Sequence, residues 1–200
     1  MSKFLAIDTS SRYLTVLAVN GEKTVLNHLP DCAMSHSVRL MGEVDKALNE
    51  ANLSVTDCDF ISAVTGPGSF TGIRIGIASA KGFAYGAGKQ LLSITSFELI
   101  AYNVADENFY VVIDAAHDHY YACGFGKDKS IITEPCYLSA EQVEGLNCPL
   151  YGFEELSFKN YKKLNAGECL PQAVNSLKDR LSNNMQALYV RKSQAEEGRK

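Results

Sequence analysis

The chain has 200 residues, a formal net charge of −4 and a hydrophobic content of 46%, as expected for a globular protein of one large or two small domains. Its apolar runs are too short to span a bilayer, and its start lacks the apolar core of a signal peptide, so we expect a cytoplasmic location and no membrane association. Clustered lysine and arginine are few, which argues against direct binding of nucleic acid. The six cysteines are widely spaced with no Cys-x2-Cys pair, and we expect reduced thiols.

The first third of the chain predicts a strand hairpin followed by a helix. Residues 4–7, 13–19 and 23–26 are rich in strand formers, and Asn20-Gly21 is typical of a tight hairpin turn. Residues 35–52 have the apolar spacing of an amphipathic helix, with Ser35 as a candidate N-cap.

The central segment predicts a buried strand over residues 60–64, a glycine-rich turn and a long helix. Ser69 or Thr71 can cap this helix, and a glycine-rich turn at a helix N-terminus suggests an anion site. The spacing fits neither the P-loop nor the dinucleotide fingerprint. The turn is therefore only a weak candidate for a phosphate cradle.

The helix over residues 71–87 is apolar on almost every side. Small residues recur every four positions along it, which allows another backbone to approach closely (Gly72, Gly76, Ala80, Ala84 and Gly88). Packing on the chain's own sheet accounts for one apolar face, and a subunit interface accounts for the second. We favour the interface, and the two alternatives stay open at this point.

The second half of the sequence repeats the opening pattern at an offset of 106. Ile7 and Asp8 correspond to Ile113 and Asp114, and residues 109–114 and 120–125 predict a second strand hairpin. Between the halves, residues 90–94 predict a strand and 96–102 a helix; after the second hairpin, residues 139–146 and 171–181 predict helices and 149–152 a strand. Two matched units indicate a duplicated α/β architecture. We divide it into residues 1–104 and 105–200 and leave open whether the last segment returns to the first lobe.

Few side chains carry the marks of a chemical site. Asp8 and Asp114 begin turns without glycine, and each either contributes to a nucleotide site or simply bonds its own backbone, which we favour. His117 and His119 could share a metal, but no further ligand is identifiable and a hairpin turn accounts for them. His36 is expected to start a helix. Ser69 lacks the spacing of a nucleophile elbow, and we predict no catalytic residue, no metal and no peptidase activity.

Three stretches carry a further signal: residues 6–10, residues 66–76 with Ala80-Lys81-Gly82, and residues 187–191. Together they resemble the TsaB (YeaZ) family of bacterial accessory proteins in N6-threonylcarbamoyladenosine modification of tRNA. The resemblance implies the duplicated fold of actin, Hsp70 and hexokinase (ASKHA). The segment Asp114-Ala115-Ala116-His117 departs from the Asp-Ala-Arg that is usual in the family.

The resemblance further implies a noncatalytic subunit that pairs with the catalytic subunit TsaD, supports recruitment of TsaE, contacts tRNA only through the complex and dimerises when alone. It places the TsaD interface on helices 35–52 and 71–87. No tightly bound cofactor is implied, and ATP or ADP is left open at the subunit interface of the complex. The alternative is an ATP-dependent transferase or kinase acting alone. The predicted nucleotide-binding residues are Asp8, Ser10 and Asp114, and the predicted interface residues are Leu40, Met41, Val44, Leu48, Gly72, Ile73, Gly76, Ile77, Ala80, Phe83 and Ala84.

Overall fold

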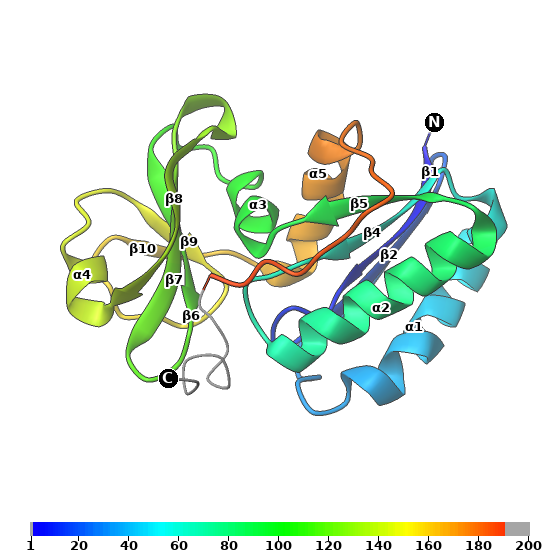
Figure 1. The fold of residues 1–200 in the computed structure, drawn as a ribbon, viewed down its shortest axis with the longest axis horizontal. Helices are drawn as coiled ribbons and strands as arrows, with labels where there is room; N and C mark the ends of the chain where they lie inside the picture. Colours follow the sequence, from blue (N-terminus) through cyan, green and yellow to red (C-terminus); the bar gives the residue numbers. More distant parts are fainter. Residues whose placement is uncertain (1, 191–200) are drawn as a thin grey trace, which may run out of the picture.

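The structure, a computed structural model, describes residues 2–190; Met1 and residues 191–200, including Arg191 of the third matched stretch, lie outside the described part. Two five-stranded sheets form two lobes that lie side by side (Figure 1). Each sheet combines an antiparallel hairpin with parallel strands. This arrangement confirms the predicted α/β class.

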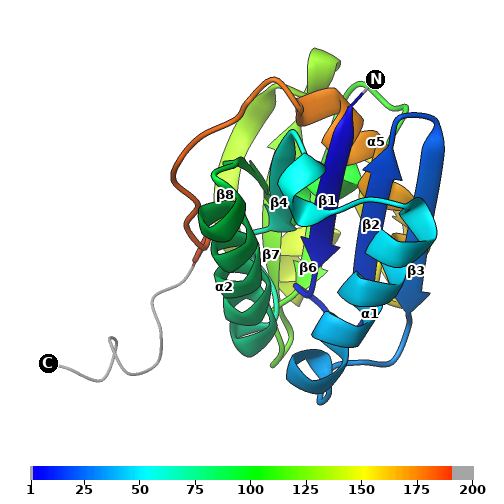
Figure 2. The same cartoon turned by 90° about the vertical axis from the view of Figure 1, so that its right-hand side faces the viewer.

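The first sheet has the order β3-β2-β1-β4-β5 and is covered by helices on both faces. Successive side chains of a strand point to opposite faces, so Leu5 and Ile7 pack with α1 and α2 while Phe4 and Ala6 pack with α5. Figure 2 shows α1 and α2 side by side on one face. The elements are β1 (Lys3–Asp8), β2 (Leu14–Asn20), β3 (Lys23–Leu29), α1 (His36–Ala51), η1 (Val55–Asp57), β4 (Phe60–Val64), α2 (Phe70–Ala87), β5 (Gln90–Ile94), α3 (Ser96–Ala101) and α5 (Ala166–Leu177).

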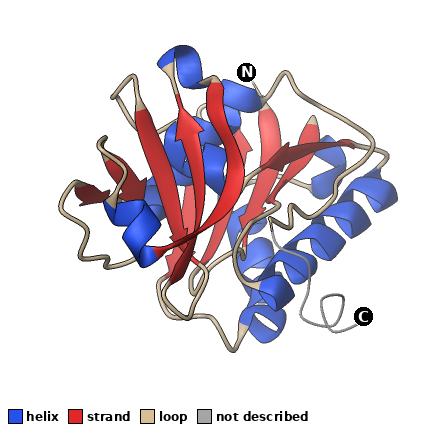
Figure 3. Ribbon diagram, turned by 60° about the vertical axis from the view of Figure 1, so that its left-hand side comes forward, coloured by secondary structure: helices blue, strands red, loops and turns tan. Residues whose placement is uncertain are grey.

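The second sheet repeats the topology of the first. Read from its other edge, its order is β8-β7-β6-β9-β10, so β6 occupies the position of β1 and the hairpin β6–β7 that of β1–β2 (Figure 3). This match confirms the duplication predicted from the offset of 106. The elements are β6 (Phe109–Asp114), β7 (His119–Phe125), η2 (Lys127–Lys129), β8 (Ile131–Ser139), α4 (Ala140–Glu144), β9 (Leu150–Gly152) and β10 (Tyr161–Lys163).

The end of the described chain returns to the first lobe. Ser182 exchanges backbone hydrogen bonds with Leu91 on the edge strand β5, and the amide of Leu188 donates to the carbonyl oxygen of Thr65. Farther along, the Tyr189 ring contacts the Phe70 ring at the start of α2. The division between residues 104 and 105 stays a prediction.

Two local predictions are wrong. Helix α5 begins at Ala166 rather than Pro171, because the Asn165 side chain caps it by accepting from the amide of Gly167, and Pro171 lies inside the helix. Ser35 precedes α1 as predicted but makes no side-chain cap; its hydroxyl donates to the carbonyl oxygen of Cys32 instead. By contrast, Ser69 caps α2 by accepting from the amide of Gly72.

The small-residue stripe of α2 packs inside the chain rather than on its surface. Gly72, Gly76, Ala80 and Ala84 are buried against the first sheet and the turn after β1. A Cβ atom on Gly76 would lie 2.5 Å from Thr9 Oγ1, and one on Gly72 would overlap the carbonyl oxygen of Thr9. The close approach predicted from the glycines is therefore real, but the backbone that approaches belongs to this chain.

Within the described residues, no helix is both long and apolar enough to cross a membrane.

Two alanine substitutions test this packing of α2, one on the side that faces the turn after β1 and one on the open side. Gly72→Ala should lower the free energy of unfolding by about 1–3 kcal/mol, because its Cβ meets a rigid backbone carbonyl. Gly82→Ala has no atom within 4 Å of its Cβ and should raise that free energy by up to about 1 kcal/mol through helix propensity. Denaturant unfolding measures both, and equal stabilities would contradict the packing described here.

Candidate functional site

The glycine-rich loop between β4 and α2 is fastened to the turn that follows β1. The amide of Ser69 donates to the carbonyl oxygen of Ser10 over 2.7 Å, and the Thr9 hydroxyl donates to the carbonyl oxygen of Gly72 over 2.7 Å. The amides of Gly72 and Ile73 are used in the cap formed by Ser69. These three amides already have partners, so fewer donors are left at this helix N-terminus for a phosphate.

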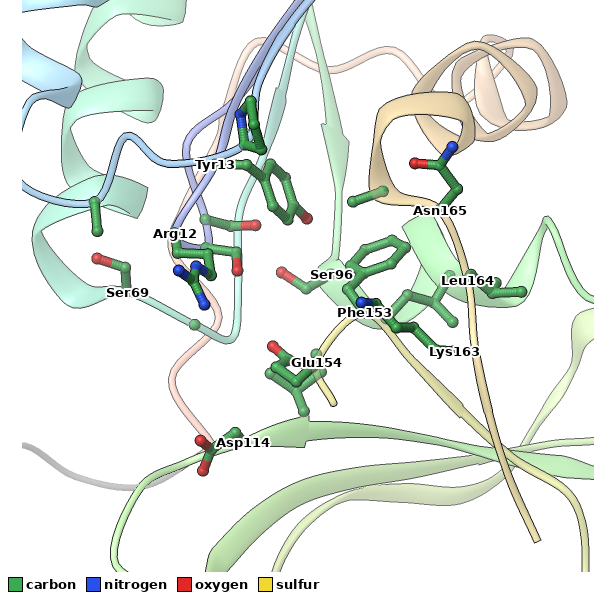
Figure 4. Close-up of a pocket in the computed structure, with 18 of the residues that line it drawn as sticks. Arg12, Tyr13, Ser69, Ser96, Asp114, Phe153, Glu154, Lys163, Leu164 and Asn165 are labelled. Carbon is green, nitrogen blue, oxygen red and sulfur yellow. The ribbon is translucent and has the colours of Figure 1, made fainter. Parts of the chain in front are cut away.

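A cavity of about 990 Å³ lies between the two lobes (Figure 4). The first lobe contributes the turn after β1, the glycine-rich loop and the start of α3. The second lobe contributes the end of β6 and the segment after β9, and residues 163–166 before α5 close the remaining side. The Tyr13 ring packs edge-on against the Phe153 ring at 5.8 Å, which links the lobes at the cavity wall.

Asp8 lies behind the cavity and does not line it. Its side chain is 1% exposed, and its Oδ1 accepts hydrogen bonds from the amide and the hydroxyl of Ser10, at 2.8 and 2.7 Å. Burial raises the pKa of Asp8, while these hydrogen bonds oppose the shift. The carboxylate thus stabilises its own turn, which is the structural role favoured from the sequence.

Ser10 and Asp114, the other two predicted nucleotide residues, both line the cavity. Asp114 is exposed at the end of β6, and its Oδ1 accepts from the amide of Ala116 over 2.8 Å. The turns that follow β1 and β6 therefore both contribute to the cavity. Nucleotide binding by these residues stays a prediction.

The charged side chains at the cavity are only partly paired. Arg12 bonds Asp31 at 2.7 Å, and Lys163 forms an ion pair with Glu155. Glu154 has no such partner among the described residues, and its Oε2 is buried without a hydrogen bond. Burial raises the pKa of Glu154, while hydrogen bonds to the backbone of Glu154 and Phe153 and the charge of Lys163 oppose the shift and the charge of Asp114 adds to it.

Neither Glu154 nor Ser96 was predicted as a site residue from the sequence. The buried hydroxyl of Ser96 also has no partner among the described residues. Both lie in segments without a recognisable motif. They come together at one cavity only because the two lobes pack against each other. Their shared signal is a polar group buried without a partner, which a sequence alone does not display.

The predicted interface residues mostly lie in the core of the first lobe. Only Met41 is exposed and Phe83 is partly buried; the rest are buried against the chain's own sheet (Leu40, Val44, Leu48, Gly72, Ile73, Gly76, Ile77, Ala80 and Ala84). Their role in an interface with a partner stays a prediction. The outer face of the same two helices instead carries Met34 before α1, Val38 on α1 and Tyr85 on α2, at 99%, 82% and 92% exposure. An apolar residue such as Val38 on the polar side of α1 was the available sequence signal.

The histidines have structural contacts. His36 is buried at the start of α1, with its Nε2 2.8 Å from the carbonyl oxygen of Tyr13. His119 stacks on Tyr137 with ring centroids 4.7 Å apart, and His117 lies in the preceding left-handed turn. Within residues 2–190, no three or more His, Cys, Asp or Glu side chains are grouped to hold a metal ion.

Comparisons with known proteins agree with this architecture. A family model described as TsaD, tRNA N6-adenosine threonylcarbamoyltransferase, matches residues 29–183. The structure of YeaZ from Pseudomonas aeruginosa matches with a TM-score of 0.80 at 21% identity, over 94% of this chain and 100% of that one, which supports the ASKHA-type fold.

Curated relatives share the sequence over part of their length. The tRNA threonylcarbamoyladenosine biosynthesis protein TsaB of Haemophilus influenzae is 34% identical over 122 residues, 58% of this chain and 51% of that protein. The protein of the same name from Escherichia coli is 31% identical over 132 residues, 64% of this chain and 57% of that protein. The chain thus spans about half the length of the curated relatives it matches.

The unpaired carboxyl group of Glu154 makes stability depend on pH. Since its pKa is raised in the folded protein, folding loses free energy as the pH rises from about 4.5, the ordinary pKa, through the raised value. Glu154→Gln should therefore raise the Tm near neutral pH, with a smaller gain near pH 4.5. Glu155→Gln, at an exposed and ion-paired position, is the control and should give no gain. A lower Tm for Glu154→Gln at neutral pH would show that the carboxylate is stabilised by a partner.

Proposed function

Since the chain belongs to the TsaD family, tRNA N6-adenosine threonylcarbamoyltransferase, and is similar to its TsaB members, we propose that it is a noncatalytic accessory subunit in N6-threonylcarbamoyladenosine modification of tRNA. In this proposal it pairs with TsaD, supports TsaE and acts in the cytoplasm. The observation that carries the proposal is the apolar outer surface of α1 and α2.

This outer surface has the composition of a docking site. Met34, Val38 and Met41 expose apolar side chains around α1, and Tyr85 does so on the neighbouring α2. Between them, α2 presents Ala78 and Gly82 with open space above, so a partner helix can approach closely. Aromatic and methionine side chains are enriched at protein interfaces. We propose that TsaD covers this surface and that a second copy covers it when the chain is alone.

The cleft supports a noncatalytic role. Neither turn that faces it contains glycine, and the amides of Ser69, Gly72 and Ile73 at the start of α2 are bonded within the chain. An acidic chain with net charge −4 also suits contact with tRNA through the complex rather than directly. ATP or ADP, if part of the assembly, belongs in this proposal at the interface between subunits.

A charge on the outer surface tests the docking site. Val38→Glu should leave the fold intact, because the side chain is 82% exposed, and should raise the Kd for the organism's TsaD at least about tenfold. Ile132→Glu, at a 57% exposed position on β8, is the matched control and should bind normally. Isothermal titration calorimetry of the purified proteins measures both. Equal affinities for the two variants would refute the assigned surface.

An ATP-dependent transferase or kinase acting alone is the competing function, favoured by the size of the cleft and by Asp8 and Asp114 near it. We expect the isolated chain to turn over ATP no faster than a buffer blank in a phosphate-release assay. Turnover that is lost in Asp8→Asn, with an unchanged circular dichroism spectrum, would favour the competing function instead.

A further inference from the structure

The cavity between the lobes has an apolar body and unsatisfied polar groups. Its walls include Tyr13, Ile113, Phe153 and Leu164. Ser96 also lines it, is only 4% exposed and has no hydrogen-bond partner for its Oγ among the described residues. In Figure 4, the Ser96 hydroxyl and the Glu154 carboxyl group point into the same open space. Buried polar groups are normally bonded, so these two indicate a ligand that supplies the missing partners.

The charges around the cavity favour a positive ligand. The cations Arg12 and Lys163 are each engaged by an acidic neighbour, Asp31 and Glu155. His28 contributes little positive charge, because burial lowers its pKa and its Nδ1 lies 2.8 Å from the Thr15 hydroxyl. Glu154 and Asp114 remain without an ion pair among the described residues.

A phosphate or carboxylate ligand would meet Glu154 and Asp114, while the nearest cations, Arg12 and Lys163, already pair with Asp31 and Glu155. Like charges in a poorly solvated site repel strongly. A metal ion is disfavoured as well, since residues 2–190 contain no cluster of three or more metal-ligating side chains. An organic cation can neutralise the charge of Glu154 and also pack its apolar part against the cavity walls.

We propose that the inter-lobe cavity binds a small organic cation, a primary ammonium group carried on an aromatic or aliphatic body. The ammonium group donates to Glu154 and to the Ser96 hydroxyl, and the body packs on Tyr13 and Phe153, whose rings also favour a nearby cation. This binding site is separate from the outer surface of α1 and α2 and does not depend on the partner assigned to it.

Three probes of similar shape but different charge test which ligand charge the cavity prefers, using the chain without substitutions. Benzylamine, benzyl alcohol and benzoate are titrated separately and followed by ligand-observed NMR, with ATP as a fourth probe. We expect benzylamine to bind, benzyl alcohol to bind at least about tenfold more weakly, and benzoate and ATP not to bind in the cavity. Binding of benzoate or ATP without benzylamine, or no binding of any probe, would overturn the proposal.

Substitutions in the chain then test which side chains contact the bound amine. Glu154→Gln should weaken benzylamine binding at least about tenfold and Ser96→Ala about threefold or more, since each loses a charged or polar contact. Glu144→Gln, at an exposed position of α4 that does not line the cavity, should leave the affinity unchanged. Circular dichroism confirms folding, and the comparison of probes on the unmodified chain stands even if a variant fails to fold. An equal loss in Glu154→Gln and Glu144→Gln would contradict the site.

Discussion

The packing of three glycines on one short turn determines the arrangement of the first lobe. Gly68, Gly72 and Gly76 each leave so little space that a Cβ atom would collide with Thr9 or Ser10 at the end of β1. Two hydrogen bonds fasten the same contact, from the Ser69 amide to Ser10 and from the Thr9 hydroxyl to Gly72. Helix α2 is therefore held against the sheet along its small-residue side. The opposite side of α2 therefore faces away from the sheet.

Both proposed sites follow from that constraint. On the outside, α2 lies beside α1 and exposes Tyr85 next to an open glycine face, which gives the surface assigned to TsaD. On the inside, the same contact fixes the turn after β1 at the mouth of the inter-lobe cavity. In this turn the carbonyl oxygen of Ser10 accepts from the amide of Ser69, and the carboxyl group of Asp8 accepts from Ser10. A cleft built this way retains its shape while losing the features that hold phosphate.

The sequence predicted the fold well because the fold depends on local patterns. The alternation in β1, the hairpin at Asn20 and the repeat at an offset of 106 all reappear in the two matched sheets. The site was harder to predict. The spacing of Gly72, Gly76 and Ala80 indicates close backbone contact but not which backbone approaches. In the structure these residues face the chain's own sheet and the turn after β1, and an interface role for them stays a prediction. Ser96 and Glu154 become candidate site residues only because the packing of the lobes buries their polar atoms at one cavity.

The most direct test of the accessory role is a reconstituted modification reaction. Unmodified tRNA is incubated with the organism's TsaD and TsaE and the threonylcarbamoyl donor, with and without this chain, and N6-threonylcarbamoyladenosine is quantified by mass spectrometry of the nucleosides. An accessory subunit predicts modification only when the chain and TsaD are both present, and none with the chain alone. Full modification without the chain, or modification by the chain without TsaD, would contradict it.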